Sequence, residues 1–123
     1  INSTATPIVT IPAYGETFQT GNPMFRWTDF RSPEYKSDQR RSVWLGVSRA
    51  EPPNYEWEIN WDMYVGDPSI DQVTIGKAPD GNGVDKLNDG RYVFVVLYSE
   101  RRRFGDLRIN RQSATNRPFI IKR

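Results

Sequence analysis

The chain of 123 residues carries a net charge of only +2, is rich in aromatic residues, and contains neither cysteine nor histidine. This length fits a single domain with one core. The two missing residue types exclude disulfides, thiolate metal sites, histidine metal ligands and histidine-based catalytic triads, and no apolar run approaches the ~20 residues of a membrane-spanning helix.

The N-terminal residues predict a tail followed by an edge strand. Residues 1–6 are small and polar and are interpreted as a tail or interdomain linker, which leaves 7–123 as the domain. The next four residues lie between Pro7 and Pro12, and proline cannot donate a hydrogen bond into a strand ladder. Because an unpaired strand edge accepts another strand readily, we predict an edge-strand contact here. Its residues are Ile8, Val9, Thr10 and Ile11.

Two further segments, 24–28 and 42–49, alternate apolar and polar residues and predict strands. In the second strand, Trp44 falls on the face opposite the aliphatic residues, together with Gly46 and Ser48. An exposed tryptophan needs a reason beyond folding, so we predict Trp44 as a binding residue. The predicted core residues of the two strands are Phe25, Trp27, Val43, Leu45 and Val47.

The clearest alternation lies in 55–64 and predicts a strand with one apolar and one polar face. We interpret the apolar face as core, and the alternative of a sugar-stacking platform built from its rings stays open. The acids on the polar face could pair for glycoside hydrolysis in a cleft, but they are interpreted as a solvated face. The predicted core face consists of Tyr55, Trp57, Ile59, Trp61 and Met63. The polar face consists of Glu56, Glu58, Asn60, Asp62 and Tyr64, whose ring is a second candidate for exposure.

The C-terminal half predicts three more strands and a glycine-rich loop. Residues 70–75 predict a strand, 91–99 are apolar on both faces and predict a central strand, and 118–121 close the domain. The loop at 78–85 has oxygen ligands that invite a calcium reading, but it lacks the bidentate glutamate of a calcium loop. Tight turns without a metal site are therefore predicted there. The calcium reading would use Asp80, Asn82 and Asp85.

Charge is distributed unevenly along the chain. Residues 50–90 hold nine acids against two bases, and residues 91–123 hold nine bases against two acids. Either the two segments neutralise each other on neighbouring strands, or they form opposite poles for end-to-end contacts. The strongest cluster is predicted at a hairpin tip, where it would bind a polyanion or an acidic protein rather than nucleic acid. Its candidate binding residues are Arg101, Arg102, Arg103 and Arg108.

About seven short strands separated by turns, with no helical segment, predict an all-β, antiparallel two-sheet sandwich of the immunoglobulin-like kind. The chain resembles the fibronectin type III-like and immunoglobulin-like domains of prokaryotic secreted and surface proteins. The resemblance lies in the proline-flanked first strand, the segment Phe25-Arg26-Trp27, and the segment 87–92 before the central strand. It implies that Trp27 is the core tryptophan, and that Leu87 and Tyr92 form a tyrosine corner in which the hydroxyl bonds to upstream backbone. This chain has one residue fewer between Leu and Tyr than that family and lacks its proline.

These observations predict a non-catalytic module of an extracellular or cell-surface protein, with no cofactor. We expect adhesion or assembly through protein partners, neighbouring domains or self-association, without nucleic acid and without membrane insertion. The alternative is a carbohydrate-binding module that holds a polysaccharide on exposed aromatic rings. Trp44 and Tyr64 are the rings that the alternation places outside the core.

Overall fold

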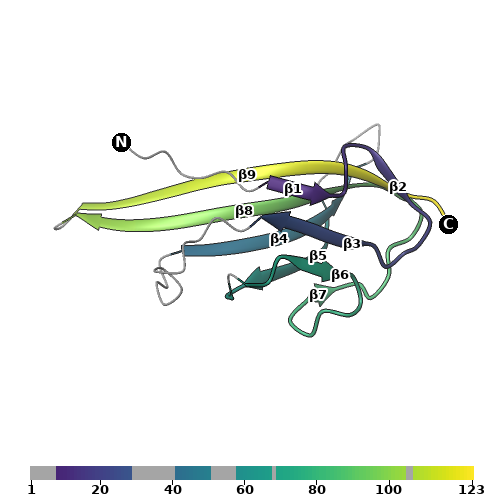
Figure 1. The fold of residues 1–123 in the computed structure, drawn as a ribbon, viewed down its shortest axis with the longest axis horizontal. Coiled ribbons are helices and arrows are strands. Elements are labelled where there is room, and N and C mark those ends of the chain that lie inside the picture. Colours follow the sequence, from purple (N-terminus) through teal and green to yellow (C-terminus); the bar gives the residue numbers. More distant parts are fainter. Residues whose placement is uncertain (1–7, 29–40, 51–57, 68, 105–106) are drawn as a thin grey trace.

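The computed structural model describes residues 8–28, 41–50, 58–67, 69–104 and 107–123. Within these ranges the chain forms nine strands and no helix, so it offers no helix long and apolar enough to cross a membrane. Figure 1 shows the arrangement. The strands are β1 (Ile8–Ile11), β2 (Glu16–Phe18), β3 (Met24–Thr28), β4 (Arg41–Arg49), β5 (Glu58–Val65), β6 (Gln72–Thr74), β7 (Asn82–Gly83), β8 (Gly90–Phe104) and β9 (Leu107–Ile121).

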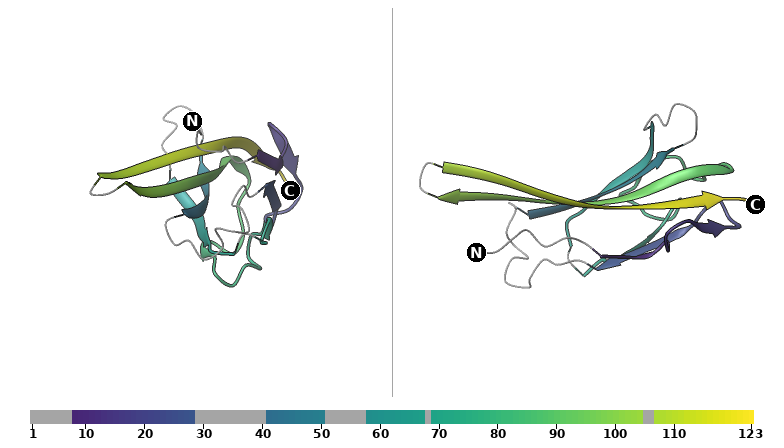
Figure 2. Two further views of the ribbon diagram at one scale, coloured as in Figure 1. Left: turned by 60° about the vertical axis from the view of Figure 1, so that its left-hand side comes forward. Right: turned by 90° about the horizontal axis from the view of Figure 1, so that it is seen from above.

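The strands form two sheets that face each other (Figure 2). The three-stranded sheet has the order β1-β3-β6, and the six-stranded sheet has the order β2-β9-β8-β4-β5-β7. Every pairing is antiparallel except the short parallel contact of β2 with β9. The predicted all-β, two-sheet architecture is confirmed. The described strands outnumber the seven expected because β2 and β7 are two or three residues long and leave no periodic signal in the sequence.

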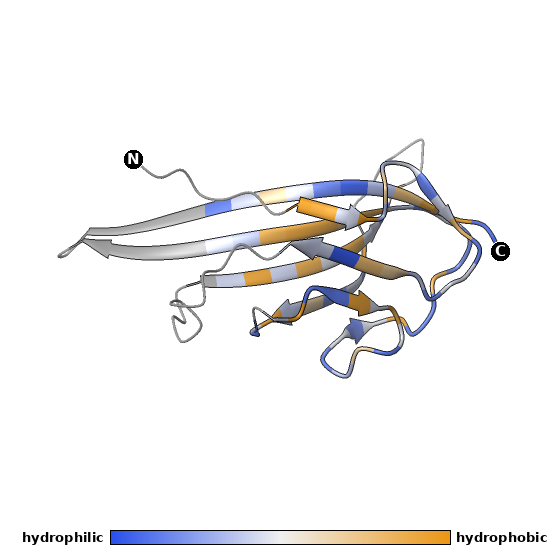
Figure 3. Cartoon of the chain, in the orientation of Figure 1, coloured by the Kyte–Doolittle hydropathy of each residue, from blue (hydrophilic) through white to orange (hydrophobic). Residues whose placement is uncertain are grey.

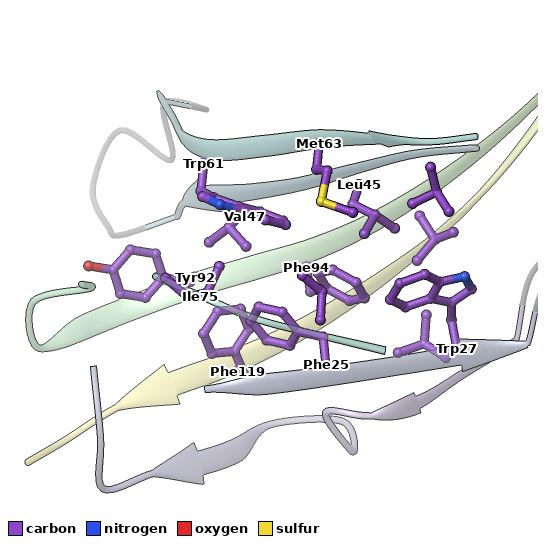
Figure 4. Close-up of a cluster of buried hydrophobic side chains, with 14 of the residues drawn as sticks. Phe25, Trp27, Leu45, Val47, Trp61, Met63, Ile75, Tyr92, Phe94 and Phe119 are labelled. Atoms are coloured by element: carbon purple, nitrogen blue, oxygen red, sulfur yellow. The ribbon is translucent and has the colours of Figure 1, made fainter. Parts of the chain in front are cut away.

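The core fills the space between the two sheets. From β3, Phe25 stacks on Phe94 of β8 with ring centroids 4.3 Å apart, and Trp27 lies next to the same ring. Figure 4 shows these rings turned toward Leu45 and Val47 of β4. Figure 3 shows the alternation of apolar and polar residues along β4 that produces this face. The predicted core residues of β3 and β4 are confirmed, since each is at most 2% exposed. Burying side chains of this size stabilises the fold by roughly 1.5–3 kcal/mol each.

The predicted apolar face of β5 is only partly correct. Trp61 and Met63 are buried, but Ile59 is 58% exposed. A register shift explains the difference, because Trp61 pairs with Val47 while Ile59 pairs with Ser48. The extra residue between the two pairs turns Ile59 to the other face of the sheet. Tyr55 and Trp57 lie outside the described residues, and Trp61 is only 3% exposed, so it cannot take part in the sugar-stacking platform considered above.

The turn before β8 contains the hydrogen bond expected of a tyrosine corner. The Tyr92 hydroxyl donates to the Asn88 carbonyl over 2.8 Å, and Leu87 is 2% exposed. The side-chain amide of Asn22 donates to the carbonyls of Ile75 and Asp85, at 2.9 and 2.6 Å. These bonds tie the 76–89 segment to the start of β3. Among all the residues that the structure describes, no cluster of three or more acidic side chains is placed to hold a metal.

The hairpin of β8 and β9 is much longer than the sequence predicts. The two strands pair over fifteen positions, from Gly90–Ile121 to Phe104–Leu107. β4 accompanies β8 only as far as Glu100, and beyond it β8 and β9 pair only with each other in the described part of the chain. We call this two-stranded end the arm and define it as Arg101–Phe104 with Leu107–Asn110. Four residue pairs extend it by about 13 Å, and Figure 1 shows it projecting beyond the other strands.

Candidate functional site

The outer face of the six-stranded sheet, which points away from the core, carries two neighbouring aromatic residues on β4 and β5. Trp44 on β4 pairs with Tyr64 on β5 and with Leu97 on β8. Tyr64 is 69% exposed, as predicted, and Trp44 is half-buried. The structure therefore brings the two predicted aromatic residues together as direct cross-strand neighbours. Such neighbours have their Cβ atoms roughly 4.5–5.5 Å apart.

The Trp44 indole is held in place at two points. Its six-membered ring lies over Gly46, where an added Cβ would be 2.6 Å from Cζ3 and 3.0 Å from Cζ2 of the ring. Its Nε1–H donates to Oδ2 of Asp62 over 3.1 Å, and Asp62 is the strand partner of Gly46. The ring is thus packed against the sheet at Gly46, and the residue as a whole is half-buried. Side-chain alternation predicted that Trp44 and Gly46 share a face, but it gave no sign that Asp62 fixes the ring.

The predicted arginine cluster lies on the arm. Arg101, Arg102 and Arg103 are in β8, and Arg108 is in β9. The register places Arg103 directly opposite Arg108, and like charges in direct cross-strand pairs are unfavourable. From Glu100 to Arg111 the hairpin holds five arginines against two acidic residues. The arm is therefore a basic element that no third described strand covers.

The predicted edge strand is at the edge of its sheet, but it is partly occupied. β1 pairs with β3 alone among the described strands. Ile8 is 54% exposed, whereas Val9 is buried at 4%. The carbonyl of Val9 already accepts a hydrogen bond of 3.0 Å from the Arg117 guanidinium of β9. An incoming strand would therefore compete with Arg117 for one of the few acceptors that β1 offers.

A shallow apolar groove of about 480 Å³ lies on the same outer face, at the end of the sheet away from the arm. Tyr14, which is 79% exposed, stands on one side of it. Pro118 and Ile120 of β9 line the floor, with Arg91 of β8 beside them. The outer face therefore offers apolar surface at both the Trp44 position and this end.

Acidic residues of the 50–90 segment contact basic residues from other parts of the chain. Asp89 lies 3.4 Å from Arg123, and Asp71 lies 4.0 Å from Arg26. All four side chains are more than one third exposed, so each pair contributes at most about 1 kcal/mol. These two contacts neutralise parts of the 50–90 segment locally, and neither of them involves an arm residue.

Comparisons with known proteins return no relative: no family model, no curated protein and no solved structure matches the chain.

Proposed function

We propose that this chain is a non-catalytic immunoglobulin-like module of a secreted or cell-surface protein, and that its arm mediates assembly with acidic protein surfaces. Neighbouring copies or neighbouring domains supply those surfaces. The observation that carries the proposal is the arm, a basic two-stranded ribbon that projects past the described strands of the sandwich.

The strand order supports the immunoglobulin-like assignment. That fold places its first, second and fifth strands in one sheet, and its third, sixth and seventh strands in the other. β1, β3 and β6 correspond to the first group, and β4, β8 and β9 correspond to the second. The hydrogen bond from Tyr92 to Asn88 gives a second, independent point of agreement. We propose the secreted or surface location only from the sequence resemblance to prokaryotic surface domains.

The arm favours a protein partner for energetic reasons. A two-stranded ribbon on its own is marginally stable in water, so a partner that packs against it should stabilise it. A partner that supplies carboxylates complements the excess of arginines in the sequence of the arm. Contacts of this kind are steered by charge and weaken with added salt. The absence of histidine and cysteine from the chain favours a binding role over catalysis.

Sedimentation velocity tests the proposal on the isolated chain. At low salt (about 20 mM) the acidic 50–90 segment of one copy is within reach of the arm of another, and at about 500 mM salt that attraction is screened. We expect weak, reversible self-association at low salt and a monomer at high salt. The triple substitution Arg101→Ser, Arg102→Ser and Arg103→Ser should abolish the low-salt association.

A matched control removes three positive charges away from the arm. Lys77, Lys86 and Lys122 are all exposed, so their joint replacement by glutamine changes the net charge equally without touching the hairpin end. This control variant should associate at least as strongly as the wild type, because Lys77 and Lys86 lie within the acidic 50–90 segment and their loss makes it more negative. A wild type that stays monomeric at every salt concentration would contradict the assembly proposal, and so would a control that loses association to the same extent as the arm variant.

A further inference from the structure

The second feature that folding alone leaves unexplained is the pair of rings on the outer face, at Trp44 and Tyr64. We propose that Trp44, Tyr64 and Asp62 form a binding site for a chain of neutral pyranose sugars. This site is separate from the arm, and the proposal goes beyond the assembly function.

The geometry fixes the orientation of the half-buried Trp44 ring on the outer face of the sheet. Gly46 allows the six-membered ring of Trp44 to approach the backbone, because any side chain there would displace it. The hydrogen bond of 3.1 Å from Nε1 to Asp62 prevents the ring from swinging away. A ligand therefore meets a ring whose orientation is already set, which reduces the entropy lost on binding.

The chemistry of the three side chains matches a pyranose. One face of a pyranose ring carries mainly C–H groups, and these are attracted to the electron-rich face of an aromatic ring. The rim of the same sugar carries hydroxyls, which donate well to a carboxylate. Trp44 offers the ring face, and Asp62, which is half-buried, offers the carboxylate beside it. Tyr64, 69% exposed on the neighbouring strand, offers a second ring and a hydroxyl.

Two considerations select neutral sugars over other ligands. The centre of a protein–protein interface is depleted of charged residues, whereas Asp62 lies directly beside the Trp44 ring. The negative charge of Asp62 also repels acidic sugars such as uronates. Two adjacent rings fit at least two consecutive sugar units, so an oligosaccharide should bind better than a monosaccharide.

The indole N–H resonances of the four tryptophans give a site-specific readout in proton–nitrogen NMR spectra. The Trp44 signal is assigned by its loss in a Trp44→Phe variant. Neutral gluco-, manno-, xylo- and galacto-oligosaccharides are titrated in turn, with an oligogalacturonate as the charged comparison. We expect at least one neutral oligosaccharide to shift the Trp44 signal in a saturable way, and the oligogalacturonate to shift it far less.

Three variants separate this site from a purely structural role of the ring. Tyr64→Ala should weaken sugar binding at least tenfold while the thermal midpoint changes little, because Tyr64 is largely exposed. Ile8→Ala truncates an exposed side chain on the other sheet and should bind like the wild type. The arm triple variant should also bind like the wild type, which keeps this proposal distinct from assembly. The inference is overturned if no neutral oligosaccharide shifts Trp44, if Tyr64→Ala binds unchanged, or if the oligogalacturonate binds as well as the neutral sugars.

Discussion

Replacing Gly46 with alanine should destabilise the domain, although the same change in a bare strand would stabilise it. Glycine in a strand interior is entropically costly, so alanine would normally gain about 0.4–1 kcal/mol. Here the new methyl would lie 2.6 and 3.0 Å from Cζ3 and Cζ2 of Trp44, whereas carbon atoms prefer 3.5–4.0 Å. The ring must shift and lose its bond to Asp62. Overpacking of this kind costs about 1–3 kcal/mol.

Urea unfolding of four proteins measures this effect: the wild type, Gly46→Ala, Trp44→Ala and the double variant. We expect Gly46→Ala to lower the unfolding free energy by about 1–3 kcal/mol in the wild type. In the Trp44→Ala background it should raise the unfolding free energy slightly, because no ring occupies the space. The coupling energy of this double-mutant cycle is then at least about 1 kcal/mol. If Gly46→Ala were as stable as the wild type, or if the two substitutions were additive, the ring would not lie over Gly46 as described.

Two further predictions concern the tyrosine corner and the arm. Tyr92→Phe removes the hydroxyl bond to Asn88 and should lower the unfolding free energy by about 0.5–1.5 kcal/mol in the same urea assay. The control Tyr14→Phe changes a side chain that is 79% exposed and should have no effect. Equal effects of the two substitutions would show that the bond from Tyr92 to Asn88 contributes nothing to stability. Replacing residues 102–109 with an Asn-Gly turn should leave the thermal midpoint nearly unchanged in calorimetry, because the arm lies beyond the end of β4 and Asn-Gly favours a tight hairpin. A large fall in that midpoint would mean that the arm belongs to the folded core.

The sequence predicts the core well because burial imposes period-two alternation. Phe25 and Trp27 in β3, and Trp61 and Met63 in β5, lie on the faces where alternation places them. Ile59 does not, because the register shift between its pair and that of Trp61 depends on the partner strand, which the sequence of β5 alone does not reveal. Alternation likewise places Trp44 on the outer face, but its half-buried state depends on contact with Gly46 and on the hydrogen bond to Asp62.

The arm is the largest feature that the sequence does not predict. Residues 101–117 carry many arginines and polar side chains, and their one alternating run, 107–110, is short and ambiguous, so only 91–99 and 118–121 are predicted as strands. In the structure these residues are held by continuous pairing of β8 with β9, which requires no buried face. Pro118 would ordinarily argue against a strand interior because it has no N–H, but its carbonyl accepts from the Gly15 N–H across 2.8 Å. Because the N–H and C=O of one residue point to the same side in an antiparallel ladder, the missing donor faces the β2 side rather than β8.

The central claim is that the arm mediates assembly, and excision of the arm tests it most directly. Sedimentation velocity at low salt should compare the wild type with the variant that has an Asn-Gly turn in place of residues 102–109. We expect the wild type to self-associate and the excised variant to be monomeric while it retains its thermal midpoint. Association of the folded, excised variant to the same extent as the wild type would contradict the claim.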